Sequence, residues 1–191
     1  MNKKTRSCEE TRLTGRILSR RDSMAIVALA AGGLALGTKS AFAAPGDGIS
    51  HSAEAIHQEP VFAAAPMRVY DALTDAKQFQ QVQLLSGAMK ALDLTSKPAE
   101  VSLELGGPIK LFGGYISGRQ LELEPGKRIV QAWRSASWPA HDYSIAKFDL
   151  VAEGTGTRIM FDHTGFPVGE AEHLAAGWKS NYWDAMTQYL K

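Results

Sequence analysis

The aromatic residues of the last third of the chain restrict the possible folds more than any other feature. All four tryptophans fall between residues 133 and 183, two in or just after a segment of strand-like sequence and two in a segment with helical spacing. Side chains of this size bury a large apolar area, and leaving them in water would be costly. The pattern predicts an aromatic-lined antiparallel sheet that is closed by an aromatic carboxy-terminal helix.

The carboxy-terminal helix is predicted from steps of three or four between apolar residues, which is the spacing of one helix face. Because this face runs the length of the helix, we expect the helix to be buried along its whole length. Gly177 is expected to let it approach the sheet closely, and Glu170 and Glu172 place favourable negative charge in its first turn. The apolar positions are Leu174, Trp178, Tyr182, Ala185, Met186 and Tyr189.

The amino-terminal segment has the layout of an export signal. Basic residues dominate the first 21 positions, and residues 23–38 carry no charge. The segment around Arg20 and Arg21 resembles a twin-arginine signal motif, although Ser-Met follows Asp22 where Phe-Leu is usual. An A-x-A sequence ends at Ala43, so residues 1–43 are predicted to be removed and the mature chain to begin at Ala44.

The apolar core of this signal, residues 25–37, is shorter than the roughly 20 apolar residues of a transmembrane helix. We therefore expect no integral membrane anchor and a periplasmic or extracellular location after cleavage. The general secretory route stays open beside the twin-arginine route. An uncleaved, disordered arm is the alternative interpretation.

Cleavage would change the charge of the working protein. Residues 1–43 hold eight Lys or Arg and three Asp or Glu, so 13 basic and 17 acidic residues remain and the formal charge moves from +1 to −4. A mildly acidic chain lacks the basic surface that nucleic-acid binding requires. The one cysteine, Cys8, lies in the predicted leader, so we expect no disulfide, thiol nucleophile or cysteine metal ligand in the mature domain.

The remaining chain is predicted to form one domain. Residues 44–54 are rich in Gly, Pro and Ser and are expected to be a flexible tether before a domain over residues 55–191. A first strand within 55–65 precedes one amphipathic helix over 66–79 and a weaker helical stretch over 80–92. Alternating or apolar segments predict strands over 101–105, 109–112, 115–124, 128–135, 143–152 and 157–164, the last two forming a hairpin. The expected class is α+β, with about six antiparallel strands curved around the carboxy-terminal helix and two short helices after the first strand.

The order of glycine, proline and aromatic residues from position 113 onward resembles the activator-of-heat-shock-protein-ATPase (AHSA) family of the START-like, or SRPBCC, superfamily. The resemblance covers roughly residues 56–190 and implies a helix-grip fold with a hydrophobic cavity beside the carboxy-terminal helix. The chain resembles the carboxy-terminal domain of the eukaryotic activators and lacks the Asn-rich, Trp-containing motif of their amino-terminal domain. The residues that carry it are Gly113-Gly114, Gly118, Glu122-Leu123, Pro125-Gly126, Ile129-Val130, Trp133-Arg134, Ser137-Trp138-Pro139, Gly154, Gly165, Pro167, Gly177-Trp178 and Tyr182.

Two binding functions follow from this resemblance. The first is capture of a small apolar molecule in the cavity, and the alternative is a co-chaperone-like module that binds a protein partner. Arg119 and Arg134 are expected to face solvent, but an inward arginine would suit a carboxylate-bearing ligand. The cavity candidates are Phe112, Tyr115, Trp133, Arg134, Trp138, Phe148, Phe161, Trp178 and Tyr182. The oligomeric state is left open.

An enzyme of cyclase or hydrolase type is the third hypothesis, and the sequence offers little for it. Asp162-His163 and His141-Asp142 are adjacent acid–histidine pairs, but neighbours on a strand point to opposite faces, so each residue is expected to lie at the surface or in a turn. His51, His57 and His173 show no metal-binding spacing. The Gly-Gly pairs at 106–107 and 113–114 match no phosphate-binding motif. We expect no catalytic residue, metal or cofactor.

Overall fold

The computed structural model describes residues 53–191. The signal motif with Arg20 and Arg21, the cleavage site at Ala43 and Ala44, and most of the expected tether lie outside the described residues. The elements are β1 (Ala53–Gln58), β2 (Val61–Phe62), α1 (Pro66–Thr74), α2 (Ala76–Leu85), α3 (Gly87–Ala91), β3 (Glu100–Val101), β4 (Pro108–Leu111), η1 (Phe112–Gly114), β5 (Ile116–Glu124), β6 (Arg128–Ser135), β7 (Ser144–Glu153), β8 (Gly156–Pro167), α4 (Ala171–Trp178), η2 (Lys179–Trp183) and α5 (Asp184–Tyr189).

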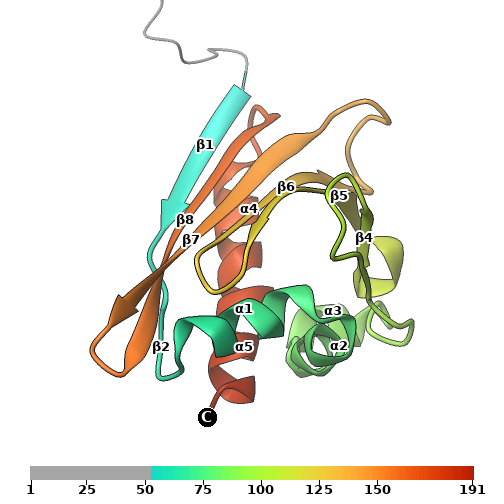
Figure 1. The fold of residues 1–191 in the computed structure, drawn as a ribbon. Coiled ribbons are helices and arrows are strands. Elements are labelled where there is room, and N and C mark those ends of the chain that lie inside the picture. Colours follow the sequence, from blue (N-terminus) through green and yellow to red (C-terminus); the bar gives the residue numbers. More distant parts are fainter. Residues whose placement is uncertain (1–52) are drawn as a thin grey trace, which may run out of the picture. The chain divides into compact units, whose positions relative to one another are not determined.

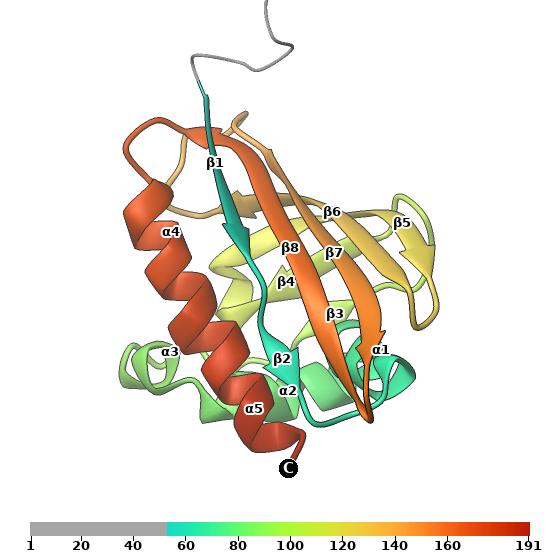
Figure 2. The ribbon, with the colours of Figure 1, turned by 90° about the vertical axis from the view of Figure 1, so that its left-hand side faces the viewer.

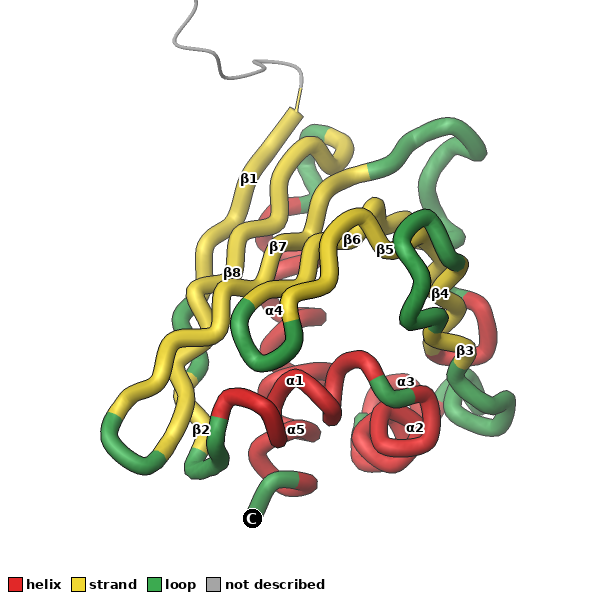
Figure 3. The backbone as a smooth tube through the Cα atoms, in the orientation of Figure 1, coloured by secondary structure: helices red, strands yellow, loops and turns green. Residues whose placement is uncertain are grey.

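These strands form one antiparallel sheet in the order β1-β8-β7-β6-β5-β4-β3, with β2 also paired to β8. The sheet bends from β1 and β8 round to β4 (Figure 1), and the carboxy-terminal helix runs along its β1–β8 side (Figure 2). The short helices α1, α2 and α3 gather at the open side of the bend (Figure 3). The predicted α+β helix-grip fold is confirmed.

The core lies on the concave face of the sheet, because alternate residues of each strand point there. In β6 the pattern is regular, and Ile129, Gln131, Trp133 and Ser135 are buried while the residues between them are half-buried. The predicted strand over 128–135 is confirmed with the same bounds. In the described part of the chain, no helix has the length and apolarity to cross a membrane.

The predicted helix over 66–79 is wrong as a continuous element. The chain leaves helical geometry at Asp75, whose side chain accepts a hydrogen bond from the Gln78 N–H at 2.8 Å and so begins a new helix. Ser86 repeats the arrangement by accepting from the Met89 N–H at 3.3 Å. Three short helices therefore stand where two were expected, because polar caps interrupt the apolar spacing.

The predicted strand over 101–105 is also wrong, since β3 ends at Val101. The chain turns at once: the Ser102 hydroxyl accepts from the Glu104 N–H, and Gly106 adopts a φ of +76°. Leu103 and Leu105 are exposed rather than alternately buried. The sheet has eight strands where about six were expected. The count includes β2 and β3, which are only two residues long each.

Gly177 does not make the expected close approach, because a Cβ built there would lie 3.9 Å from its nearest neighbour, the Asn181 side chain. The tight contact is at Gly118 in β5, where a Cβ would lie 2.0 Å from the Ala132 carbonyl oxygen on β6. Glycine is required there because any side chain would enter the neighbouring backbone.

Replacing Gly118 with alanine is expected to force β5 and β6 apart and to lower the free energy of unfolding by about 1–3 kcal/mol, the usual cost of overpacking. Gly87→Ala is the matched control, because a Cβ at Gly87 meets nothing within 4 Å. Urea unfolding of both variants tests the difference. Equal stability of the two variants would show that the strands can separate freely at Gly118.

Candidate functional site

A pocket of about 330 Å³ opens between α3, the carboxy-terminal helix and the adjoining ends of β5 and β6. Its volume lies near the lower end of the range of about 300–1,000 Å³ that is common for small-molecule sites. Glu170 is the charged carboxylate of the lining, and the described residues contribute no Lys or Arg to it. The lining residues are Ala88, Met89, Leu92, Phe112, Tyr115, Ile116, Trp133, Ser135, Glu170, His173, Leu174, Ala176, Gly177, Trp178, Ser180, Asn181 and Tyr182.

Five of the nine cavity candidates lie in this lining: Phe112, Tyr115, Trp133, Trp178 and Tyr182. Phe148 and Phe161 instead pack in the core beneath Trp178, with ring centroids 5.7 Å and 4.4 Å from it. Trp138 is buried against Trp133, 5.4 Å away. The structure thus brings most of the aromatic residues into one cluster but divides them between the pocket wall and the core.

Arg134 does not reach the pocket. Its guanidinium donates to the carbonyl oxygens of Trp138 at 2.7 Å and Pro139 at 3.3 Å, and so fixes the loop after β6. Arg119 donates to the Gly106 carbonyl oxygen at 2.9 Å from an exposed position. Neither arginine is placed to bind a ligand carboxylate in the pocket.

The wall at Phe112 is held by a glutamine that sequence reasoning missed. Phe112 is fully buried with a φ of +50°, which is unfavourable for a residue with a side chain. The Gln83 carbonyl oxygen accepts the Phe112 N–H at 2.7 Å, while the Gln83 amide donates to the Lys97 carbonyl oxygen at 3.1 Å. A buried side chain with both ends satisfied offsets the local strain.

A second missed contact joins α3 to the carboxy-terminal helix. The Ser86 hydroxyl donates to the Asn181 amide oxygen at 2.7 Å, and both side chains are buried. Asn181 belongs to η2, where the helix widens into a π-turn and the Asp184 N–H donates to the Lys179 carbonyl oxygen five residues earlier. The wide turn lets three consecutive residues, Asn181 to Trp183, all be buried. The 3.6-residue repeat of a regular α-helix does not predict three consecutive buried residues, so the sequence pattern could not have indicated this turn.

His163 lies at the centre of the aromatic cluster, although a surface or turn position was expected. It is fully buried in the middle of β8, which extends to Pro167. The Trp178 indole N–H donates to His163 Nδ1 at 2.9 Å. Because an indole nitrogen only donates, Nδ1 carries no proton and the proton of the neutral ring sits on Nε2.

His163 Nε2 donates in turn to the Ser144 hydroxyl at 2.6 Å, and that hydroxyl donates to the Trp133 carbonyl oxygen at 3.0 Å. Burial lowers the pKa of His163 to about 3, which keeps the ring neutral. A histidine that donates to a serine cannot at the same time take its proton. The buried Ser144–His163 pair therefore orders the core in this arrangement and does not form a nucleophile with its base.

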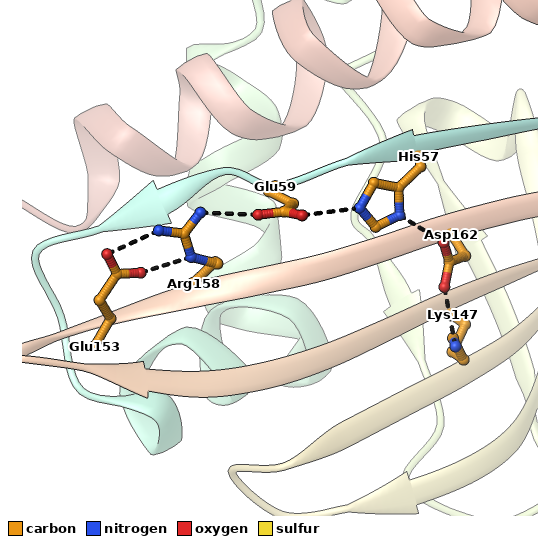
Figure 4. Close-up of polar contacts among 6 residues, drawn as sticks. All are labelled: His57, Glu59, Lys147, Glu153, Arg158 and Asp162. Carbon is orange, nitrogen blue, oxygen red and sulfur yellow. Dashed lines mark hydrogen bonds and ion pairs between the residues drawn. The ribbon is translucent and has the colours of Figure 1, made fainter.

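The prediction that Asp162 and His163 point to opposite faces is confirmed. Asp162 lies on the outer face of the sheet, where its carboxylate contacts His57 at 2.7 Å and Lys147 at 2.9 Å (Figure 4). His57, expected beside a flexible tether, is held in β1 between Asp162 and Glu59, and these two hydrogen bonds raise its pKa. These contacts belong to a longer row in which each side chain contacts one of opposite charge. In order along the row, its members are Glu153, Arg158, Glu59, His57, Asp162, Lys147, Asp149, Arg128 and Glu122.

The other two histidines that the structure describes, His141 and His173, do not form a polar site. His141 is exposed in the turn region after β6, whereas His173 is exposed at the pocket edge. His51 lies outside the described residues. Over residues 53–191, no three His, Cys, Asp or Glu side chains are grouped so that they could hold a metal ion.

Comparison with known proteins shows which family the chain belongs to. Residues 63–191 match the family described as "Activator of Hsp90 ATPase homolog 1-like protein". An activator of 90 kDa heat shock protein ATPase homolog from Dictyostelium discoideum is 31% identical over 124 residues, which are 64% of this chain and 29% of that protein. Homolog 2 from Mus musculus is 28% identical over 97 residues, which are 51% of this chain and 29% of that protein. The chain thus spans less than a third of these relatives.

Solved structures agree on the fold. The crystal structure of an Hsp90 activator from Plasmodium falciparum superposes with a TM-score of 0.60 at 24% identity, covering 71% of this chain and 95% of that one. CalU16 from Micromonospora echinospora gives a TM-score of 0.58 at 22% identity, covering 73% and 77%. Family match and shared helix-grip architecture together show that the chain belongs to the family of Activator of Hsp90 ATPase homolog 1-like proteins, with a START-like fold.

Proposed function

We propose that this protein is an exported, non-catalytic START-like domain that binds a small apolar molecule in the pocket between α3 and the carboxy-terminal helix. The observation that carries the proposal is the pocket itself, whose wall is formed mainly by aromatic and aliphatic side chains. Such a wall supplies affinity by removing apolar ligand surface from water. His163 is neutral and donates its Nε2 proton to the Ser144 hydroxyl, which supports a binding role rather than acid–base chemistry.

Filling the pocket is expected to abolish this binding. Ala88 is an exposed residue of α3 that lines the pocket, so Ala88→Trp would occupy the site without disturbing a buried residue. N-phenyl-1-naphthylamine, a neutral apolar probe that fluoresces when it leaves water, should bind the wild type and lose at least ten-fold in affinity in this variant. Fluorescence titration measures both.

The matched control is Ala91→Trp, on the same helix but outside the lining. It should bind the probe as the wild type does. Equal loss of affinity in both variants would indicate a general effect on α3, and unchanged binding in both would place the probe elsewhere.

Export is the second part of the proposal, and the basic leader, the Arg20-Arg21 pair and the A-x-A sequence support it. Replacing both arginines with lysine is expected to leave the full-length chain in the cytoplasm if the twin-arginine route is used. Cell fractionation followed by mass spectrometry should find a wild-type amino terminus at Ala44. A wild-type chain that keeps residues 1–43 in the cytoplasm contradicts export.

A protein-binding module is the second candidate, because the matched relatives are named as activators of the heat-shock-protein ATPase. Measured ATPase rates of a purified 90-kDa heat-shock protein with and without the described domain, residues 53–191, test this directly. Stimulation by the domain that survives Ala88→Trp would favour a protein interface away from the pocket. A rate unchanged at saturating domain concentration speaks against the activator role.

A further inference from the structure

Two polar groups of the pocket wall lack partners. Trp133 and Tyr182 both line the pocket and are 3% and 5% exposed. Among the described residues, neither the Trp133 indole nitrogen nor the Tyr182 hydroxyl has a hydrogen-bond partner. An unpaired buried donor is costly, and such groups in a folded protein call for an explanation.

The two side chains lie on the same indole: the ring centroid of Trp178 is 5.5 Å from that of Trp133 and 4.1 Å from that of Tyr182. Burial raises the pKa of the Tyr182 hydroxyl, and the Trp133 indole N–H partly offsets that rise, although the pair does not form a hydrogen bond of normal geometry. The other indole of the lining differs, since the Trp178 N–H donates to His163. Within the described residues, the Trp133 and Tyr182 donors of the lining are therefore unpaired, whereas the Trp178 donor is satisfied.

We propose that Trp133 and Tyr182 form a recognition pair for a neutral hydrogen-bond acceptor, so that the pocket selects flat apolar molecules that carry a ketone-type carbonyl. This inference rests on the proposed ligand-binding function. One carbonyl oxygen has two lone pairs and can accept from the Trp133 N–H and the Tyr182 O–H together. Both donors would then be satisfied by a single atom.

The charges of the pocket favour a neutral ligand over an acid. Glu170 lies in the lining, whereas Arg134 and Arg119 are engaged with backbone carbonyl oxygens elsewhere. A carboxylate placed in this wall would lose its hydration without gaining a cation. The small volume of about 330 Å³ also favours a compact ring system over a long-chain lipid.

Both donor atoms are buried, so an entering ligand must displace neighbouring side chains. The wall that can move with the least loss of buried surface is α3, which contains no buried residue. Its first turn is tied to the carboxy-terminal helix through the Ser86–Asn181 hydrogen bond. Ala88 and Met89 of this helix line the same pocket as Trp133 and Tyr182, so a shift of α3 would widen the pocket on the side opposite the sheet.

Two matched probes test this recognition. 2-Acetylnaphthalene and 2-isopropenylnaphthalene differ only in an oxygen that replaces a methylene group, and displacement of N-phenyl-1-naphthylamine measures both affinities. The wild type should bind the ketone about ten-fold more tightly. Tyr182→Phe removes only the hydroxyl and should reduce this preference to two-fold or less, with the affinity for the hydrocarbon unchanged. Trp133→Phe removes the N–H together with part of the ring, so both affinities can change, but the preference for the ketone should again fall to two-fold or less.

Tyr189→Phe is the control, because the Tyr189 hydroxyl donates to Gln78 at 3.2 Å outside the pocket. This variant should keep the ten-fold preference. Without ligand, Tyr182→Phe should melt at the same temperature as the wild type or higher, because it removes an unpaired group.

The outcomes separate the two ideas. A wild type that binds both compounds equally, or a preference that survives both pocket variants, overturns the recognition pair and leaves the apolar pocket standing. A wild type that binds neither compound nor the fluorescent probe overturns the proposed ligand-binding function and the recognition pair with it.

Discussion

Replacing Trp178 with alanine is expected to lower the free energy of unfolding by about 3–5 kcal/mol, the usual cost of removing a large aromatic side chain from a core. Trp178 is 2% exposed, and its ring lies 4.1 Å from Tyr182, 4.4 Å from Phe161 and 5.5 Å from Trp133, centroid to centroid. The substitution would leave a cavity and also strip His163 Nδ1 of its donor. Domains of this size have about 5–15 kcal/mol to lose.

Urea unfolding followed by far-ultraviolet circular dichroism measures this loss without depending on the tryptophan signal. Trp178→Phe separates the two contributions, because it keeps an aromatic ring and removes the N–H, at an expected cost of about 1–3 kcal/mol. Tyr143→Ala is the aromatic control: Tyr143 is 53% exposed, and its loss should change stability by less than about 0.5 kcal/mol. A Trp178→Ala domain as stable as Tyr143→Ala would mean that the cluster is not the core.

Stability is expected to fall as the pH drops below 6.5, because His163 cannot accept a proton while the domain is folded. Its pKa is about 3 in the folded domain and 6.5 as an ordinary histidine. Between these values the unfolded chain binds a proton that the folded domain does not. The contribution of His163 is therefore complete above pH 6.5 and is lost at about 1.4 kcal/mol per pH unit as the pH falls toward 3.

His57 acts in the opposite direction. Its hydrogen bonds with Asp162 and then Glu59 raise its pKa, so its contribution is present below pH 6.5 and is lost as the pH rises through the folded value. Since His57 is exposed, that effect is expected to be small. His57→Gln provides a background in which it is removed.

Denaturation of His57→Gln at pH 7, 6 and 5, with and without His163→Asn, measures the His163 contribution. Asparagine can still accept from the Trp178 N–H but does not titrate. The double variant should be less stable at pH 7 and should lose about 1 kcal/mol less for each pH unit below 6. Parallel pH profiles would show that His163 is not a neutral, buried group.

Much of the fold could be predicted from the sequence because it follows from local periodicity. Strand β6 and the carboxy-terminal helix carry patterns of alternation and of three-to-four spacing that tertiary contacts reinforce. The errors arose where one polar residue overrides the pattern. Asp75 caps a new helix, and Ser102 starts a turn in a segment whose leucines alternate without being buried.

The candidate site was harder to predict from the sequence, because its geometry depends on contacts between residues that are far apart in the chain. Gln83 meets Phe112 29 residues away, and Ser86 meets Asn181 95 residues away. The sequence offered one clue, the Phe-Gly-Gly run at 112–114, whose three residues all have positive φ. His163 was misplaced because its partners Ser144 and Trp178 come from β7 and α4, and a strand pattern shows which face a residue takes but not what it meets there.

The wide turn of η2 shows how the carboxy-terminal helix can accommodate a change of one residue in its length. A π-turn accommodates one residue more than an α-helical turn while the segments before and after it keep their faces toward the same neighbours. A chain one residue shorter between Lys179 and Trp183 could therefore form an uninterrupted α-helix with Trp178 and Met186 still inward. The helix can therefore gain or lose one residue at this point while its two halves keep the same neighbours. A one-residue gap here in an alignment with a relative would not imply that the two halves pack differently.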